Sequence, residues 1–568
     1  MAAYPFADTR FFTHASLPVA AAYCRTLDVM GVVNRIVPSS MRLSPGLAVQ
    51  AMVLDVLSGR SPLYREEEFW EQQDRLLLLG KDVDSHIFND TNLGRALDAI
   101  FEAGPTRIIT ELGLEAAKKF DLDVSTVSYD TTSTTVWGAY RGSERNPPVE
   151  GPRIVRGHSK DKRPDLKQFM TELLCVERGV PICSSTLDGN SSDKISNNRM
   201  LSRISSLMAR HGLGTGAFTY VADSSVVTTG NLSLLAGIPF VSRLPRNFAV
   251  CDQAVDRAVE SGQWTHIGRL AELPSTRNAA EYKSHETTVD IEGRSWRAVV
   301  VHSNAQDKRR QKSIDYELGV SLKKISAMTK GVQKRYFCEK DAGAAALAIS
   351  QMETSLHTVK ASYGETVVNR RGRPPKEGPR PTNTYYDLVW EVLIREDRLQ
   401  LLREQAGCFV LLSNIPSSGD DSLDAKALLR CYKGQYGVES DFAFLKDPLV
   451  VNDLFLKTPS RIDALGMILV IALLIWRLME RQMRMYLAHE GKRLPGWDNK
   501  PTDRPTSFMM STVFYGIQVA RPRRGDPILL RPLSDRQMQF LDALGLDERV
   551  FLDKNIKCML QCRGKPDD

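Results

Sequence analysis

The stretch YKGQYGVESDFAFLK, residues 432–446, combines an acid, several aromatic residues, a glutamine and a lysine in a pattern typical of a helix. Each residue of an α-helix advances by about 100°, so four polar side chains fall within an arc of roughly 60°. These are Tyr432, Gln435, Glu439 and Lys446. The other side carries Phe442, Phe444 and Leu445, which can anchor the helix in a core. The pattern therefore predicts a packed helix whose Glu439 faces a specific partner.

The composition is that of a soluble globular protein. The chain has 568 residues, too many for one compact core, which predicts several domains. Charged residues make up 25% and apolar residues 42%, both ordinary values for a folded chain. The net charge of +7 is compatible with a polyanionic partner but is also common in proteins without one.

The cysteines and the apolar runs bear on compartment and membrane association. Nine cysteines are scattered without a CxxC pair or paired histidines, which argues against a zinc site. Their odd count and the absence of an N-terminal signal indicate reduced thiols and a cytoplasmic location. The longest apolar run, 464–476, is shorter than the roughly 20 residues that span a bilayer, so we expect a buried core helix and no membrane partner. We expect Arg477, Glu480 and Arg481 where this helix emerges from the core.

The pattern of apolar residues divides the chain into regions. Residues 1–120 have helical spacing and no evident strand, with a helix start at Ser44 and Pro45 and a further helix over 93–120. Strands and helices alternate from residue 121 onwards. The predicted regions are a helical N-terminal domain at 1–120, a first core part at 121–248, an insertion at 249–405, a second core part at 406–488 and a C-terminal region at 489–568 that is a candidate for oligomerisation.

Two short apolar segments each end on an aspartate. VSTVSYD at 124–130 ends on Asp130, and FTYVAD at 218–223 ends on Asp223. Singly, each acid has an ordinary explanation, because strand-terminal aspartates are often turn residues and helical glutamates are usually solvated. Together with Glu439 they would repel strongly at low dielectric, so the combination indicates a magnesium site. Two such ions about 4 Å apart can activate a water and stabilise a leaving oxygen, which indicates phosphoryl transfer on nucleic acid.

The order of these residues resembles a known enzyme family. Asp130, Asp223 and Glu439, with Tyr432 and Lys446 around the last, resemble the DDE transposases of the IS4 superfamily and most closely its IS1634-like branch. The family signature is Tyr, two residues, Arg, three residues, Glu, six residues, Lys, and the spacing is met throughout. Gln435 stands where many members have Arg, which weakens the phosphate contact expected there. Supporting stretches are SYDTTS at 128–133, GHSKDKRPDLKQ at 157–168, LDGNSSD at 187–193 and LKDPLVVNDLFLK at 445–457.

The resemblance covers roughly residues 20 to 485 and implies an α/β (α+β) fold. It implies an RNase H-like catalytic core that is interrupted between Asp223 and Glu439 by a largely β insertion, with a helical N-terminal domain and a C-terminal helical region. It makes Asp130, Asp223 and Glu439 the ligands of two Mg²⁺ or Mn²⁺ ions. It makes Tyr432 and Lys446 contacts to the DNA end, with Gln435 as a weaker substitute for the missing arginine. The implied partners are the terminal inverted repeats, the target DNA and a second subunit in a synaptic homodimer.

Three further groups are weaker candidates for DNA binding. The basic stretch at 157–167 holds Lys160, Lys162, Arg163 and Lys167, although such charge runs are usually solvated. The Pro-rich segment 367–384 is expected to be an extended, exposed linker, and its Arg371 and Arg373 spell the RGRP core of an AT-hook, which enters a narrow minor groove. Trp296 could stack on a flipped base, but a buried strand tryptophan is the simpler interpretation.

The hypothesis is a DNA transposase that cuts insertion-sequence ends and joins their 3′-OH to target DNA. One alternative is a catalytically silent DNA-binding regulator derived from a transposase, and another is a two-metal nuclease without strand transfer. The presence of all three acids favours the enzyme over the regulator. The N-terminal helices are a reasonable place for recognition of the DNA ends, because short helices can fill a major groove.

Overall fold

The computed structural model describes residues 8–59, 61–140, 150–177, 179–214, 216–270, 280–375, 378–447 and 456–560. The fold is mixed α/β. The chain forms two compact units: residues 1–243 and 413–568 make the first unit, and residues 244–412 make the second. The predicted insertion at 249–405 falls within the second unit, whereas the predicted N-terminal domain shares the first unit with both parts of the predicted core. The eight cysteines of the described residues are free.

The N-terminal part of the first unit is helical apart from one strand. Its elements are β1 (Thr9–His14), α1 (Leu17–Leu27), α2 (Val29–Ile36), α3 (Pro45–Leu57), α4 (Glu66–Gln72), α5 (Arg75–Leu79), α6 (Asp90–Ala103) and α7 (Pro105–Lys119). Ser44 caps α3 as predicted, because its side chain accepts a hydrogen bond from the backbone of Leu47. The helical pattern predicted over 93–120 is confirmed as two helices, since Gly104 adopts φ 90° and Pro105 begins a new helix.

The expectation of no strand in residues 1–120 was wrong. β1 pairs antiparallel with β16 (Ile517–Pro522), in register from Thr9 opposite Pro522 to His14 opposite Ile517. β16 also pairs with β17 (Ile528–Leu529). The partner of β1 lies at the far end of the chain, so the local sequence around residue 10 shows no hairpin or repeated strand pattern.

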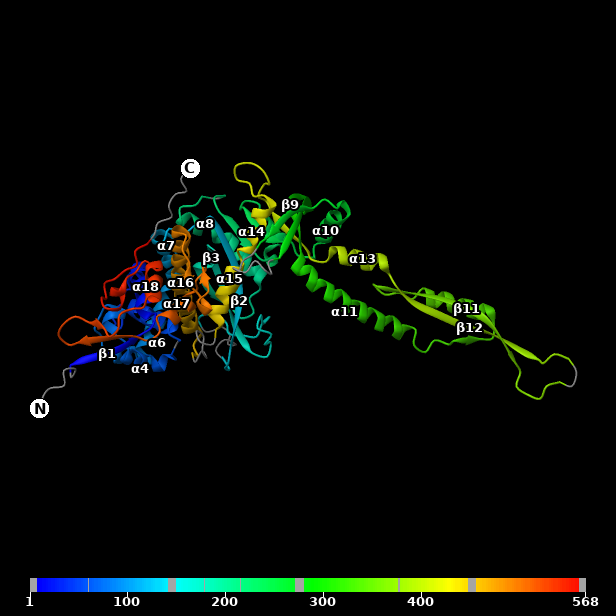
Figure 1. Cartoon of the computed structure of the whole chain (residues 1–568), viewed down its shortest axis with the longest axis horizontal. Helices are drawn as coiled ribbons and strands as arrows, with labels where there is room; N and C mark the ends of the chain where they lie inside the picture. The colour runs from blue at the N-terminus through cyan, green and yellow to red at the C-terminus, as the bar shows by residue number, and fades with distance from the viewer. Residues whose placement is uncertain are drawn as a thin grey trace. The chain divides into compact units, whose positions relative to one another are not determined.

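The central sheet of the first unit has the strand order β4-β3-β2-β5-β6. Its strands are β2 (Thr126–Val136), β3 (Lys167–Val176), β4 (Val180–Leu187), β5 (Thr219–Ala222) and β6 (Phe240–Arg243). β2, β3 and β4 form an antiparallel meander, whereas β5 lies parallel to both β2 and β6. The helix α8 (Asp193–Arg210; Figure 1) connects β4 to β5, and α9 (Thr229–Leu235) connects β5 to β6.

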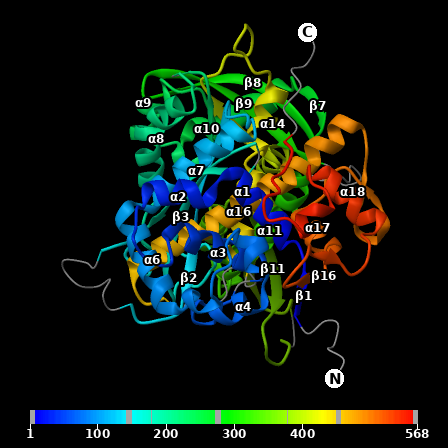
Figure 2. The same ribbon diagram turned by 90° about the vertical axis from the view of Figure 1, so that its left-hand side faces the viewer.

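The second part of the first unit supplies the remaining helices. They are α14 (Ala425–Lys433), α15 (Tyr436–Lys446), α16 (Pro459–Glu490), α17 (Ser507–Val513) and α18 (Asp535–Ala543). Between α16 and α17, the short strands β14 (Leu494–Pro495) and β15 (Pro501–Thr502) pair with each other. α16 runs through the middle of the unit, where it packs against α1, α3, α6 and α7 as well as β4 (Figure 2).

α16 is the core helix that the apolar run predicted. By length and composition it could cross a membrane, but 78% of its most apolar window is buried inside the protein. The charged end of the run differs from the prediction, because Glu480 and Arg481 are buried rather than emerging into solvent. Arg477 is also largely buried, and its guanidinium bonds the carboxylates of Asp441 and Glu480. Tertiary pairing therefore extends the buried face of the helix beyond its apolar segment.

Asp463, at the start of α16, allows a pH-dependent prediction. Burial raises the pKa of its carboxyl to about 6, although a hydrogen bond from Thr186 acts in the opposite direction. The unfolded chain releases this proton near pH 4, so the folded protein loses stability as the pH rises between these values. We expect Asp463→Asn to raise the free energy of unfolding by about 1–3 kcal/mol at pH 8 and by less than about 1 kcal/mol near pH 4. Urea unfolding of both proteins across this range measures the difference, and an equal gain at both pH values would contradict it.

The second unit combines helices with strands, whereas the family resemblance implied a largely β insertion. Its elements are α10 (Ala249–Ser261), β7 (Thr265–Arg269), β8 (Glu281–Ile291), β9 (Arg294–Ser303), α11 (Asn304–Met328), β10 (Arg335–Tyr336), α12 (Glu339–Ser350), β11 (His357–Asn369), β12 (Thr382–Ile394), α13 (Glu396–Gln405) and β13 (Cys408–Ser413), whose last residue belongs to the first unit. Its sheet has the order β13-β9-β8-β7. α11 leads from β9 towards the hairpin of β11 and β12 (Figure 1).

The described residues of the segment 367–384, predicted to be an extended linker within the insertion, are the ends of β11 and β12 and the loop between these strands. β11 and β12 pair antiparallel from His357 opposite Ile394 to Asn369 opposite Thr382. The sequence RGRPP follows directly after the last pairs, and its described residues are exposed as predicted. The pairing of β11 with β12 at this end was not predicted, because the prolines between the two strands dominate the composition of the segment.

Candidate active site

The register of the sheet places Asp130 and Asp223 next to each other. In the parallel pairing of β2 with β5, Tyr129 lies opposite Ala222, so Asp130 and Asp223 occupy the following position on each strand. Neighbouring strands are about 4.8 Å apart, and equivalent residues on them share a face. Asp223 follows the last residue of β5 as predicted, but Asp130 lies inside β2, which continues to Val136 against β3. Asp130 thus marks where the parallel pairing ends and not where its strand ends.

Asp130 is an acid whose charge is poorly solvated. Its Oδ1 accepts a hydrogen bond of 2.7 Å from the backbone N–H of Thr131. Burial raises the pKa of Asp130 to about 7, and the negative charges of Asp223 and Asp193 add to this shift. Lys160 acts in the opposite direction, with its Nζ 3.8 Å from Asp130 Oδ1. The site therefore has an excess of negative charge that one ammonium group only partly offsets.

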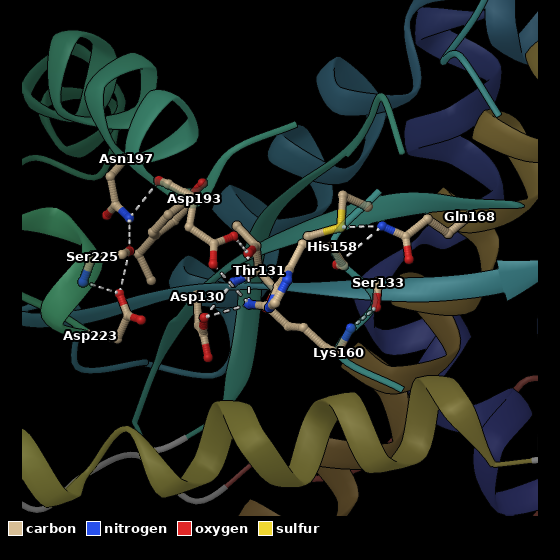
Figure 3. Close-up of polar contacts among 12 residues, drawn as sticks. Asp130, Thr131, Ser133, His158, Lys160, Gln168, Asp193, Asn197, Asp223 and Ser225 are labelled. Atoms are coloured by element: carbon tan, nitrogen blue, oxygen red, sulfur yellow. Dashed lines mark hydrogen bonds and ion pairs between the residues drawn. The ribbon is translucent and has the colours of Figure 1, made fainter. Parts of the chain in front are cut away.

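Asp223 is held by the turn that follows β5. Its Oδ1 accepts hydrogen bonds from the backbone N–H and the hydroxyl of Ser225, at 3.0 and 2.5 Å. The Ser225 hydroxyl also accepts a bond of 3.0 Å from Asn197 Nδ2, which in turn donates to the backbone oxygen of Asp193 at 2.9 Å. Ser242 on β6 donates to the backbone oxygen of Asp223. This network ties the second aspartate to the first turn of α8 (Figure 3).

The quoted stretch 432–446 forms two helical segments instead of one. α14 ends at Lys433 and α15 begins at Tyr436, although Gly434 and Gln435 keep helical dihedral angles. The backbone tightens here, because Gly437 and Val438 donate to the residues three positions before them. On the apolar side Phe442 and Leu445 are buried, and Phe444 packs on Trp476 with ring centroids 5.6 Å apart. The predicted anchoring of the helix is confirmed.

The polar face of α15 lies along β2 and the basic stretch 157–167. α15 packs against β2, and Gln435 Nε2 lies 3.5 Å from the backbone oxygen of Tyr129, the residue before Asp130. At the other end of the helix, Lys446 Nζ bonds Asp161 Oδ1 at 2.6 Å. Glu439 is exposed between these two contacts.

The electrostatics of Tyr432 connects the helix with both aspartates. Burial raises the pKa of Tyr432, and the negative charges of Asp223, Glu439 and Asp130 raise it further. Arg243, at the end of β6, acts in the opposite direction. The carboxylates of all three predicted acids thus act on the pKa of one tyrosine. The stripe of polar residues on the helix and the ends of the parallel strands therefore belong to one region of the first unit.

In this arrangement the acids bond protein donors. Among the residues that the structure describes, no three His, Cys, Asp or Glu side chains are arranged to hold a metal ion. Asp130 bonds Thr131, and Asp223 bonds Ser225. The donor set nevertheless suits a hard divalent cation, because the half-buried carboxylate of Asp130 has two like charges near it and gains from a doubly positive partner.

The basic stretch 157–167 divides between the site and the surface. Lys160 lies at Asp130 as described above, whereas Lys162 is exposed. Arg163 bonds Asp165 at 2.9 and 2.6 Å and lies over the exposed ring of Trp137. Lys167 begins β3 and donates to the backbone oxygen of Ala139. Among the contacts of these described residues, Lys160 has one to a predicted catalytic acid, Asp130.

Sequence reasoning did not single out the side chains that complete the site. Asp193, in the first turn of α8, accepts a hydrogen bond of 2.5 Å from the hydroxyl of Thr131. Asp161 pairs with Lys446, and Arg243 follows the register of Asp130 and Asp223 on the next parallel strand. The stretch LDGNSSD ends on Asp193, which was the available signal. Of the stretch 445–457, residues 448–455 lie outside the described residues.

The second unit contains the other predicted contacts to DNA. Trp296 on β9 is 4% exposed and packs opposite Val289 of β8, so its ring is not available to stack on a base. The simpler interpretation of Trp296, a buried strand tryptophan, is the one that the structure supports. Arg371 and Arg373 are exposed in the loop between β11 and β12.

Removal of the two loop arginines tests the AT-hook hypothesis. We expect the double variant Arg371→Ala and Arg373→Ala to lose preference for A·T-rich over G·C-rich duplexes. We also expect the slope of log K against log salt to fall by about 0.9 for each lost phosphate contact. Fluorescence anisotropy at several salt concentrations measures both, with the double variant Arg398→Ala and Arg403→Ala, at exposed positions of α13, as the charge-matched control. Unchanged preference and slope would remove the loop from the DNA interface.

One family model matches the chain. Residues 11–114 match a domain of unknown function (DUF4277), which is found in transposase-like proteins. The matched region contains α1 to α6 and most of α7. No curated protein matches the chain.

Proposed function

We propose that the chain is a DNA transposase resembling the IS1634-like branch of the IS4 superfamily, with an RNase H-like catalytic core. It cleaves DNA at the ends of its insertion sequence and transfers the freed 3′-OH into target DNA. The observation that most supports this proposal is the parallel register of β2 and β5, which gives Asp130 and Asp223 equivalent positions. In addition, the charges of Glu439 and of both aspartates raise the pKa of the same residue, Tyr432. The match of residues 11–114 to a domain found in transposase-like proteins is consistent with the proposal.

The three acids would hold two Mg²⁺ or Mn²⁺ ions. When bound, these ions supply an activated water or hydroxyl and stabilise the leaving oxygen of a phosphodiester. Thr131 and Ser225 orient the carboxylates of Asp130 and Asp223 through hydrogen bonds, so neither acid would need a backbone movement to bind a cation. α15 presents Glu439 on its exposed face.

The residues around Glu439 would position the DNA end. Tyr432 and Gln435 lie beside the strand ends, and Lys446 can exchange Asp161 for a phosphate, since an exposed or half-buried ion pair contributes little. A lysine places one positive charge on the backbone without reading sequence. Water then attacks the phosphodiester at the end of the element, and the 3′-oxygen leaves. In the second step the freed 3′-OH attacks a target phosphodiester, and the 3′-oxygen of the target strand leaves as the new bond forms.

The proposed partners are the terminal inverted repeats, the target DNA and a second copy of the chain. Synapsis of two DNA ends requires that two active sites meet, which favours a homodimer. The reaction would take place in the cytoplasm on nucleoid DNA.

Strand transfer with pre-cut ends tests the proposed function. The substrate is a duplex that carries a candidate terminal repeat and a free 3′-OH, mixed with plasmid DNA and Mn²⁺. We expect joined product with the intact protein and none with Glu439→Gln. Nicking of an uncut repeat without joining would indicate a nuclease, and repeat binding without either reaction would indicate a silent regulator. Either result would contradict the proposal.

A further inference from the structure

The side chain of Lys160 reaches into the carboxylate site from the loop before β3. Its Nζ donates to the backbone oxygen of Thr131 at 2.6 Å and contacts the hydroxyl of the same residue at 3.1 Å. It also lies 3.4 Å from Asp193 Oδ2 and 3.8 Å from Asp130 Oδ1. Figure 3 shows this ammonium group directed at the two acids and Thr131. Lys160 thus has four oxygen neighbours from β2 and α8.

The loop holds Lys160 in this place. The backbone N–H of Lys160 donates to the hydroxyl of Ser133 on β2 at 3.0 Å. Gln168 Nε2 bonds the backbone oxygens of His158 and Gly189 at 3.3 and 2.6 Å, which links the loop to the segment that leads into α8. The side chain of Lys160 is 28% exposed, so the contacts are partly screened from solvent. The position of the ammonium is therefore set by the fold.

The contacts of Lys160 are those that a cation would make. Carboxylate, carbonyl and hydroxyl oxygens are the donors that Mg²⁺ and Mn²⁺ prefer. We propose that Lys160 is the internal counter-ion of the carboxylate site and that a divalent cation must displace it from Asp130. The inference rests on the proposed function, because it assumes that Asp130 is a metal ligand. It assigns Lys160 a second role beside the predicted contact to DNA.

The consequence is that Lys160 lowers the affinity of the DNA-free protein for metal. A unit positive charge about 4 Å from a ligand repels a divalent ion and satisfies the carboxylate that the ion would use. Lys160→Met keeps the length and the apolar stem of the side chain but removes its charge. We expect this variant to bind Mn²⁺ about tenfold more tightly than the intact protein, in the absence of DNA. A merely structural role of Lys160 would leave the affinity unchanged or lower it.

Titration of Mn²⁺ followed by electron paramagnetic resonance of the free ion measures this affinity in the full chain. Lys160→Arg keeps the charge and should bind Mn²⁺ as the intact protein does. Lys194→Met removes an exposed charge next to Asp193 and is the matched control, with an expected change of less than about twofold. Circular dichroism confirms that each variant is folded.

The outcomes distinguish this inference from the proposed function. Tighter binding in Lys160→Met alone supports the displacement of Lys160. Equal binding in the intact protein and Lys160→Met, with Asp130→Asn binding none, would overturn the inference and leave the metal site intact. No binding of Mn²⁺ by any of these proteins, with or without a terminal-repeat duplex, would overturn both.

Discussion

Replacing Asp130 by asparagine is expected to lower the rate of DNA-end cleavage by about 10³-fold or more, because residues that act as one catalytic unit lose most of the activity when one is removed. Asparagine has the same shape, and its Oδ1 can still accept the hydrogen bond of 2.7 Å from Thr131. The change therefore removes charge and leaves the strand in place. Affinity for the terminal repeat should be unchanged or higher, since a negative charge near the DNA is lost.

The cleavage rate is measured with an end-labelled terminal-repeat duplex and saturating Mn²⁺, and DNA binding is measured in parallel. Asp542→Asn is the matched control, because this acid is exposed on α18, away from the carboxylate site. If Asp130→Asn cleaves within tenfold of the intact protein, the acid has no direct part in the chemistry. If it neither binds DNA nor folds, Asp223→Asn provides the same test at the neighbouring strand.

The second large effect concerns the buried charges that hold α15 in place. Arg477 on α16 bonds Asp441 Oδ1 at 2.6 Å, Glu480 Oε2 at 2.7 Å and the hydroxyl of Ser440 at 2.9 Å. The side chains of Asp441 and Glu480 are 0% and 4% exposed. Burial raises the pKa of the Asp441 carboxyl, and Arg477 acts in the opposite direction. Asp441 is compensated by this guanidinium, whereas Glu480 also pairs with Arg484 Nη2 at 3.4 Å.

We expect Arg477→Met to lower the free energy of unfolding by about 3–5 kcal/mol, because removal of one partner leaves the buried charge of Asp441 without compensation. Arg461→Met on the same helix is the control. Arg461 pairs with Asp98 at 2.7 Å, but these side chains are 35% and 43% exposed, so the loss should not exceed about 1 kcal/mol. Urea unfolding at pH 7 compares the three proteins. Equal stability of both variants would show that the buried cluster does not hold the fold.

This cluster also bears on the orientation of Glu439. Asp441 follows Glu439 by two residues, which places the two side chains about 200° apart on the helix. With Asp441 fixed against α16, the opposite face of α15 carries Glu439 away from the core. A folded Arg477→Met protein should therefore lose cleavage activity more strongly than its stability at the assay temperature explains.

Local patterns were sufficient for the elements that carry the acids. Short apolar segments predicted the strands before Asp130 and Asp223, and the polar stripe with its apolar back predicted the anchored helix of Glu439. The end of the first strand was misplaced, because β2 continues beyond Asp130 through pairing with β3. Nothing in an isolated strand indicates how far a neighbour extends it.

The remaining features depend on contacts between distant segments. β1 and β16 pair across the whole chain, and Lys160 meets Asp193 from a different loop. The charged end of α16 is buried because distant segments supply its partners: Asp441 of α15 for Arg477, Ser507 of α17 for Glu480 through a bond of 3.1 Å, and Glu177 for Arg481. Composition alone marks such residues as solvent-exposed, since charged side chains are rarely buried without a partner. Only the tertiary structure identifies the partner.

The most direct measurement is the anomalous diffraction of Mn²⁺ in a crystal of the protein bound to a terminal-repeat duplex. We expect Mn²⁺ within about 2.0–2.6 Å of carboxylate oxygens from Asp130, Asp223 and Glu439, with Lys160 moved away from Asp130. A complex in which the two aspartates hold Mn²⁺ while Glu439 stays out of reach of every ion would contradict the joint action of the three acids.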